Sequence, residues 1–98
     1  MCGIAGQIRR PGDTVSQGIL DGFATALAHR GLDGQGQWLA GNVGFVQTRL
    51  AIIDLDTGDQ PLHGPEDTHL IANGEIYNYL ELRDMLAPQD WQTRSDCE

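Results

Sequence analysis

The stretch QWLAGNVGFVQTRLAIIDL, residues 37–55, carries the strand signals on which a prediction of the fold depends. Residues 37–40 and 43–48 are mostly apolar, and Gly41-Asn42 between them is a two-residue hairpin turn, although Asn-Gly is the favoured order. Residues 49–55 contain an apolar run that predicts a further strand with a buried centre. The middle of the chain is therefore expected to consist of three strands.

Three elements are expected before this stretch. Residues 2–9 indicate a strand whose glycines allow close approach of neighbouring backbone. Thr14 or Ser16 is suited to cap a helix that runs to about His29, because apolar residues recur every four positions along it. The run HRGLDGQG at 29–36 is polar and punctuated by glycine, so it is expected to be a loop.

Further elements are expected after it. The run DTGD at 56–59 predicts a turn, and residues 68–73 predict a strand. A helix is expected over about 76–86, with Pro88 soon after its end because proline cannot continue a helix. Residues 91–93 indicate the start of one more strand.

The charge balance argues against a nucleic-acid or membrane partner. The 98 residues include 6 Lys plus Arg and 14 Asp plus Glu, a formal net charge of -8. An acidic surface repels phosphate groups, so nucleic-acid binding is not expected. No apolar run approaches the roughly 20 residues of a transmembrane helix, and the N-terminus lacks the features of a signal peptide. A cytoplasmic location is the default expectation.

The two cysteines, Cys2 and Cys97, lie near opposite ends of the chain. Without a secretory signal the compartment is expected to be reducing, which argues against a disulfide between them. The sequence has no Cys-x-x-Cys and no His/Cys pair at metal-ligand spacing, so no metal site is expected.

Cys2 has the chemistry of an N-terminal nucleophile. Its small side chain permits removal of Met1, which would give Cys2 a free α-amine that can act as a base near neutral pH. A thiol beside its own amine needs no separate histidine, which is the logic of N-terminal threonine nucleophiles. An early cysteine can also be an ordinary buried thiol, and position alone favours that interpretation.

Two further features point to substrate chemistry. Asn73-Gly74 lies between a predicted strand and a predicted helix, where an Asn amide and a Gly N–H can form an oxyanion hole; a plain turn explains the pair equally well. Arg49 precedes an apolar run, and burying its guanidinium requires a carboxylate. That carboxylate is either a substrate α-carboxylate or a structural one such as Asp33 or Asp54.

Other polar residues carry weaker signals. Asp96 and Glu75 are acids that could hold a substrate ammonium, but most of the 14 acids are expected to be solvated. The histidines at 29, 63 and 69 are scattered along the chain, and none is assigned a catalytic role.

Taken together, five ordered blocks resemble the class II (N-terminal nucleophile) glutamine amidotransferases of the asparagine synthetase kind. The blocks are Cys2-Gly3-Ile4, HRGLDGQG at 29–36, RLAIIDLDTGDQPL at 49–62, NGEIYNYLELR at 73–83 and TRSDCE at 93–98. The Ala-Asn-Gly-Glu run at 72–75 separates this kind from amidotransferases for glucosamine phosphate or phosphoribosylamine synthesis, which usually carry His-Asn-Gly.

The resemblance implies a glutaminase mechanism. Cys2 attacks the side-chain amide of L-glutamine, its α-amine shuttles the proton, and Asn73 with Gly74 stabilises the oxyanion. A γ-glutamyl thioester forms, ammonia leaves and water regenerates the thiol. The substrate-binding residues implied are Arg49 for the α-carboxylate, Asp96 and Glu75 for the α-amino group, and the backbone of Leu50, Ala51, Ile52 and Ile53 for the pocket wall.

The resemblance also implies a larger protein. Its fold is α+β, a four-layer αββα sandwich, of which residues 2–98 are expected to supply only the N-terminal part, so the isolated segment is expected to be unstable or inactive. The segment itself needs no cofactor. ATP and Mg2+, the amidation of aspartate and a Ser-Gly-Gly-x-Asp-Ser loop belong to a synthetase domain absent here, and that domain and a homodimer are the implied partners.

The sequence departs from the family pattern at three positions. Leu32 replaces the usual proline of the loop, and Gln47 and Thr48 stand where the family often has histidine and a charged residue. These changes are expected to affect local packing and to spare the mechanism. Two alternatives to asparagine synthesis are a related natural-product amide synthetase and a catalytically silent fragment that retains only the fold. An unrelated α/β binding module would not carry all five blocks.

Overall fold

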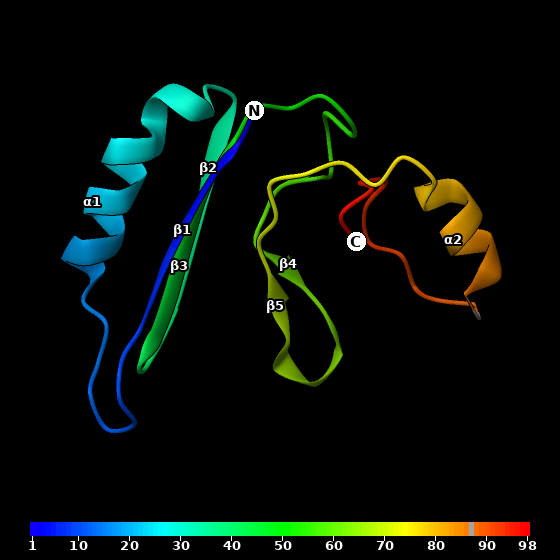
Figure 1. Ribbon diagram of the computed structural model, residues 1–98. Coiled ribbons are helices and arrows are strands. Elements are labelled where there is room, and N and C mark those ends of the chain that lie inside the picture. The colour runs from blue at the N-terminus through cyan, green and yellow to red at the C-terminus, as the bar shows by residue number, and fades with distance from the viewer. Residues whose placement is uncertain (87) are drawn as a thin grey trace.

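The computed structural model describes residues 1–86 and 88–98. Its elements are β1 (Gly3–Ile8), α1 (Gln17–Leu27), β2 (Gly34–Ala40), β3 (Val43–Arg49), β4 (Leu62–His63), β5 (His69–Leu70) and α2 (Tyr79–Met85), with short 3-10 turns at Ala28–Arg30 and Pro65–Asp67. Figure 1 shows α1, the three-stranded sheet, the β4–β5 hairpin and α2 following one another across the molecule. The chain therefore has an α+β fold with antiparallel sheets, and no helix in the described part is long and apolar enough to span a membrane.

The main sheet has the order β1-β3-β2 and is antiparallel throughout. The predicted hairpin is confirmed, because Ala40 pairs with Val43 and leaves Gly41 and Asn42 as the turn. Gly41 has a φ of 56°, which glycine adopts without strain. Asn42 then bonds the end of β1, donating from Nδ2 to the Arg9 carbonyl at 2.9 Å and accepting the Arg9 N–H at 2.8 Å. The turn thus joins all three strands.

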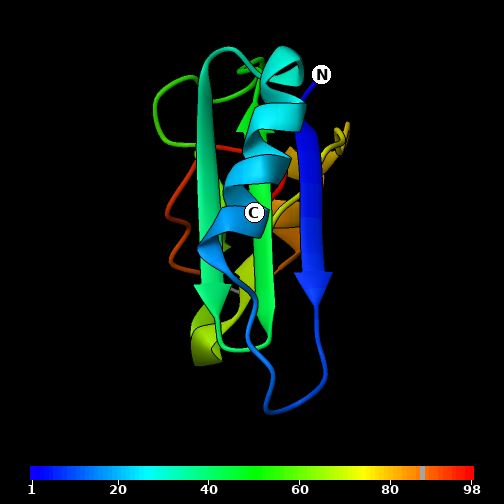
Figure 2. The same ribbon diagram turned by 90° about the vertical axis from the view of Figure 1, so that its left-hand side faces the viewer.

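Helix α1 covers one face of this sheet (Figure 2). Ser16 caps it as predicted, accepting the Ile19 N–H at 3.4 Å through Oγ. Leu20 and Ala24 are buried against Val46 of β3, with Val15 completing the cluster. Ile19 is one of the apolar residues, spaced by four, that predicted the buried face of this helix. That prediction was wrong for Ile19, which is 40% exposed, because the face turned to β3 follows positions 20 and 24.

The opposite face of the sheet meets the β4–β5 hairpin. Trp38 packs on Phe45 with ring centroids 5.0 Å apart, and on His69 of β5 at 4.2 Å. Gly36 of β2 makes room for the chain before β4: a Cβ there would collide with the Gln60 carbonyl and approach Pro61 Cδ to 2.9 Å. The lack of a side chain at Gly36 therefore sets how closely this segment approaches the sheet.

The prediction of a strand over 49–55 was wrong beyond its first residue. β3 ends at Arg49, and the chain then wraps around the Arg49 side chain, whose Nη2 donates to the carbonyls of Ile53, at 3.2 Å, and Asp54. The Ala51 N–H binds Asp33 Oδ2 at 2.8 Å instead of a neighbouring strand. Side-chain partners have replaced the ladder bonds that a strand would need.

Later elements are shorter than predicted. The strand over 68–73 is limited to His69–Leu70, since the Ala72 N–H is taken by Gln60 Oε1 at 2.6 Å. The helix over 76–86 is limited to Tyr79–Met85 and ends before Pro88. Residues 91–93 form a loop instead of a strand, and the predicted loop 29–36 already contains the first three residues of β2.

Candidate functional site

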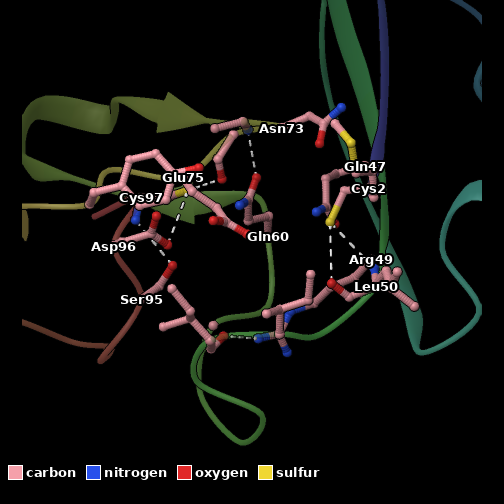
Figure 3. A pocket seen from close by; sticks show the side chains of 17 residues that line it. Cys2, Gln47, Arg49, Leu50, Gln60, Asn73, Glu75, Ser95, Asp96 and Cys97 are labelled. Atoms are coloured by element: carbon pink, nitrogen blue, oxygen red, sulfur yellow. Dashed lines mark hydrogen bonds between the residues drawn. The ribbon is translucent and has the colours of Figure 1, made fainter.

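A pocket of about 260 Å³ lies between the end of β3 and the loops that follow this strand. It gathers segments that are far apart in the sequence: the N-terminus, the end of β3, the stretch before α2 and the C-terminal loop (Figure 3). The predicted site residues that line it are Cys2, Arg49, Leu50, Ile52, Ile53, Asn73, Gly74, Glu75 and Asp96. Ala51 does not line it, because its N–H is turned to Asp33.

Cys2 reaches the pocket because β1 pairs with the centre of the sheet. Gly3 pairs with Thr48, so the residue before it lies beside the end of β3. The Leu50 N–H donates to Cys2 Sγ at 3.3 Å, and the thiol donates to the Leu50 carbonyl at 3.6 Å. Met1 also lines the pocket, so its removal would both open this end and create the free α-amine of Cys2.

Arg49 is held by structural partners on three sides. It is 7% exposed, and Nη1 forms an ion pair with Asp59 Oδ1 at 2.9 Å, while Nη2 binds the carbonyls of Ile53 and Asp54. The sequence suggested the carboxylates of Asp33 or Asp54 as structural partners, and the structure places Asp59 there instead. A planar guanidinium fixed in this way presents its charge to the pocket at a defined position.

Asp54 stabilises the loop that carries Arg49's carbonyl partners. Its Oδ1 accepts the Thr57 N–H at 2.9 Å, and its Oδ2 accepts the Thr57 hydroxyl and the Arg94 N–H, the latter at 2.7 Å. Burial opposes ionisation of this carboxyl, but these hydrogen bonds outweigh it and lower the pKa of Asp54 from 3.8 to about 2. Asp54 thus ties the 54–57 turn to the C-terminal loop.

This pKa predicts how stability depends on pH. Because the folded-state pKa lies below the unfolded value, the contribution of Asp54 is present above pH 3.8 and is lost as pH falls toward about 2. Asp54→Asn is expected to lower the thermal midpoint at pH 5 and to flatten its decline between pH 4 and pH 2. Thermal melts at these pH values check this, with Asp90→Asn as a control at an exposed carboxyl. An unchanged decline in Asp54→Asn would contradict the assignment.

The Asn73-Gly74 segment is anchored at both ends. Gln60 Oε1 accepts the Ala72 N–H at 2.6 Å on one side, and Asp96 Oδ2 accepts the Ile76 N–H at 2.6 Å on the other. Asp96 is 7% exposed and lines the pocket beside this segment. The predicted oxyanion residues are thus held at the pocket wall by side chains rather than by a strand.

Arg83 of α2 holds the loop that carries Asp96. It donates to the carbonyls of Thr93 at 3.1 Å and Ser95 at 2.7 Å, and its guanidinium lies 4.4 Å from the Trp91 ring centroid. Glu98 closes the loop from the other side by accepting the Thr93 N–H at 2.7 Å. The position of Asp96 therefore depends on Arg83 of α2. This contact between the helix and the C-terminal loop was not predicted from the sequence.

Sequence reasoning missed several residues that line the pocket, among them the polar side chains of Gln47, Gln60 and Cys97. Gln47 was noted only as a departure from the family pattern, and its position two residues before Arg49 on one strand is the signal that places both on the same face. Its neighbour Thr48 faces α1 and donates to the Leu27 carbonyl at 3.1 Å. Thr48 therefore ties β3 to the helix, while Gln47 belongs to the site.

Cys97 places a second thiol at the pocket. Both cysteines are free, and Cys97 Sγ lies 3.9 Å from the Gly74 carbonyl. Burial, and next the neighbouring Asp96 carboxylate, raise the pKa of the Cys97 thiol. Because the thiolate is the reactive form, Cys97 is a poor nucleophile here.

Two features of metal and nucleotide sites, a cluster of metal ligands and a phosphate-binding loop, are not found among the described residues. Within residues 1–86 and 88–98, no three His, Cys, Asp or Glu side chains lie together as metal ligands would. The sequence also has no Ser-Gly-Gly-x-Asp-Ser loop to receive a triphosphate.

Comparison with known proteins identifies the family. A model described as a glutamine amidotransferase domain matches residues 1–98. A glutamine-hydrolysing asparagine synthetase of Bacillus subtilis is 39% identical over the whole chain, which covers 14% of that protein, and one of Arabidopsis thaliana is 38% identical over the whole chain, which covers 17%. Asparagine synthetase B of Escherichia coli is 42% identical over 74% of the chain and 13% of its own length.

The chain thus spans less than a fifth of the length of these relatives. The match with the family model nevertheless extends over every residue and includes all five blocks, of which all but the one at 29–36 contribute residues to the pocket. The chain therefore belongs to the glutamine amidotransferase domain family.

Proposed function

We propose that this chain is the glutaminase part of a glutamine-hydrolysing asparagine synthetase. The observation that carries the proposal is the convergence of a free thiol, a buried arginine and a buried carboxylate on one pocket of about 260 Å³. A volume just below that of drug-sized sites suits a small amino acid. L-glutamine offers a carboxylate for Arg49, an ammonium for Asp96 and Glu75, and a carboxamide for Cys2.

The proposed reaction has two stages, formation of a thioester on Cys2 and hydrolysis of that thioester. After loss of Met1, the α-amine of Cys2 accepts the thiol proton as Sγ attacks the carboxamide carbon of L-glutamine. Asn73 Nδ2 and the Gly74 N–H donate to the developing oxyanion. The amine returns the proton to the leaving nitrogen, ammonia departs and a γ-glutamyl thioester remains. Water attacks the thioester, giving L-glutamate and the free thiol.

Covalent labelling tests this function. In the longer protein that contains this chain, after loss of Met1, the glutamine analogue 6-diazo-5-oxonorleucine is expected to add one adduct, mapped to Cys2, because only a bound glutamine analogue is held at attacking distance. Intact-mass spectrometry followed by peptide mapping measures the stoichiometry and the site. Excess L-glutamine is expected to slow the labelling by competition.

Cys97→Ser is the matched control, since it removes the other pocket thiol. This variant is expected to take up the same single adduct at an unchanged rate. An adduct that maps to Cys97, or no adduct on the longer protein after loss of Met1, would overturn the glutaminase assignment.

The remaining expectations concern the longer protein. We infer that the two sheets and the two helices form part of a four-layer αββα sandwich, supported by the order of layers in Figure 1. ATP and Mg2+ are assigned to a fused synthetase domain, as the resemblance to asparagine synthetases implies. We also propose that the longer protein is a homodimer and lies in the cytoplasm. The exposed Leu80 and Met85 of α2 offer apolar surface for contacts with other parts of that protein.

A further inference from the structure

Gln47 is a buried polar side chain whose presence the fold does not explain. It is 1% exposed, and neither Nε2 nor Oε1 has a hydrogen-bond partner among residues 1–86 and 88–98. A buried amide without partners lowers stability, and most such groups in proteins are satisfied. An unpaired amide at this position is therefore available to a ligand.

The surroundings of Gln47 show which ligand it would meet. It lines the pocket together with Cys2 and Arg49 (Figure 3), and its strand partner Ile4 lies on β1 only two residues beyond the nucleophile. Figure 3 draws Gln47 and Cys2 on the sheet side of the pocket, opposite Glu75, Asp96 and Cys97. The amide of Gln47 thus belongs to the end of the pocket where the reacting group of a substrate must lie.

We propose that Gln47 is a substrate-binding residue that recognises the side-chain carboxamide of L-glutamine in preference to the carboxylate of L-glutamate; the proposal rests on the glutaminase function proposed above. Oε1 of Gln47 accepts a hydrogen bond from the substrate amide N–H, while Asn73 and Gly74 provide donors for the substrate oxygen. The carboxylate of L-glutamate has no hydrogen to donate, so Oε1 accepts no hydrogen bond from it. Gln47 therefore favours the substrate over the product of hydrolysis.

Calorimetric titration of the Cys2→Ala variant, made in the longer protein that contains this chain and lacking Met1, tests this, because that variant binds ligands without turning them over. Adding Gln47→Leu is expected to weaken L-glutamine binding by about 10- to 100-fold, the effect of losing a hydrogen bond in a desolvated site. L-glutamate binding is expected to change by less than about threefold. The preference for L-glutamine thus falls by at least threefold. Gln47→Met, of nearly the same shape as glutamine, is expected to give the same loss.

Folding and site effects are separated by two further measurements. The unliganded thermal midpoint of the Gln47→Leu protein is expected to be unchanged or raised, since an unpaired buried amide has been removed. Gln7→Leu is the matched control, a glutamine on the neighbouring β1 strand that does not line the pocket. It is expected to leave the preference intact.

The outcomes distinguish the two proposals. If Gln47→Leu and Gln47→Met weaken both ligands equally, or weaken neither, the role of Gln47 is overturned while the glutaminase function stands. If the Cys2→Ala variant of the longer protein binds no L-glutamine at all, the glutaminase function is overturned, and the role of Gln47 with it.

Discussion

Replacing Cys2 by alanine in the longer protein that contains this chain, after loss of Met1, is expected to lower the rate of L-glutamine hydrolysis by about 10,000-fold or more. Alanine keeps the free α-amine but removes the sulfur, so no thioester forms. The affinity for L-glutamine is expected to stay within about threefold, because the residues proposed to hold the substrate remain. Release of ammonia measures the first quantity, and calorimetric titration measures the second.

Two controls accompany this variant. Cys97→Ser removes the other pocket thiol and is expected to retain activity within about threefold, since its raised pKa makes it a poor nucleophile. A chain that retains Met1 keeps the sulfur but has no amine on Cys2, and it is expected to be as inactive as Cys2→Ala. Substantial hydrolysis by either Cys2→Ala or the Met1-bearing chain would rule out the N-terminal thiol–amine mechanism.

Gly36→Ala is expected to destabilise the fold by about 3 kcal/mol and to weaken L-glutamine binding as well. The added Cβ would collide with the Gln60 carbonyl oxygen and lie 2.8 Å from its carbonyl carbon and 2.9 Å from Pro61 Cδ. Backbone atoms cannot rotate away as the end of a side chain can. Because Gln60 Oε1 anchors Ala72, displacing this segment also shifts Asn73 from the pocket wall.

Gly34→Ala provides the comparison on the same strand. A Cβ at Gly34 meets nothing within 4 Å, so this variant is expected to change the free energy of unfolding by less than about 0.5 kcal/mol. Urea denaturation followed by fluorescence measures both variants, and titration with L-glutamine measures their affinity. Equal effects at the two glycines would show that strand propensity, rather than contact with the Gln60-Pro61 segment, decides the outcome.

Local patterns were sufficient where the structure depends on local interactions. The Ser16 cap, the helix after it, the strand near Cys2 and the Gly41-Asn42 turn appear where the sequence places them, within one or two residues. Each depends on neighbouring residues or on an apolar face of regular period, both of which are visible in a single sequence.

Prediction failed where side chains from distant segments replace backbone pairing. Residues 50–55 have the composition of a strand, yet Arg49 and Asp33 take their polar groups. Residues 91–93 likewise become a loop because Arg83 and Glu98 bind their backbone. Periodicity cannot report such contacts, because it carries no information about which distant side chain reaches the segment.

By itself, the sequence determined the order of the five blocks along the chain and, through their resemblance to known amidotransferases, the family and its α+β class, since such blocks are defined by residue type and spacing. The tertiary structure alone decided that Asp59 pairs with Arg49, that Gln60 and Asp96 hold the Asn73-Gly74 segment, and that Gln47 enters the pocket with its amide unpaired. These relations join residues that are 10 to 20 positions apart, or leave a buried atom without a partner. Both follow from how the chain packs in three dimensions, so neither leaves a periodic trace in the sequence.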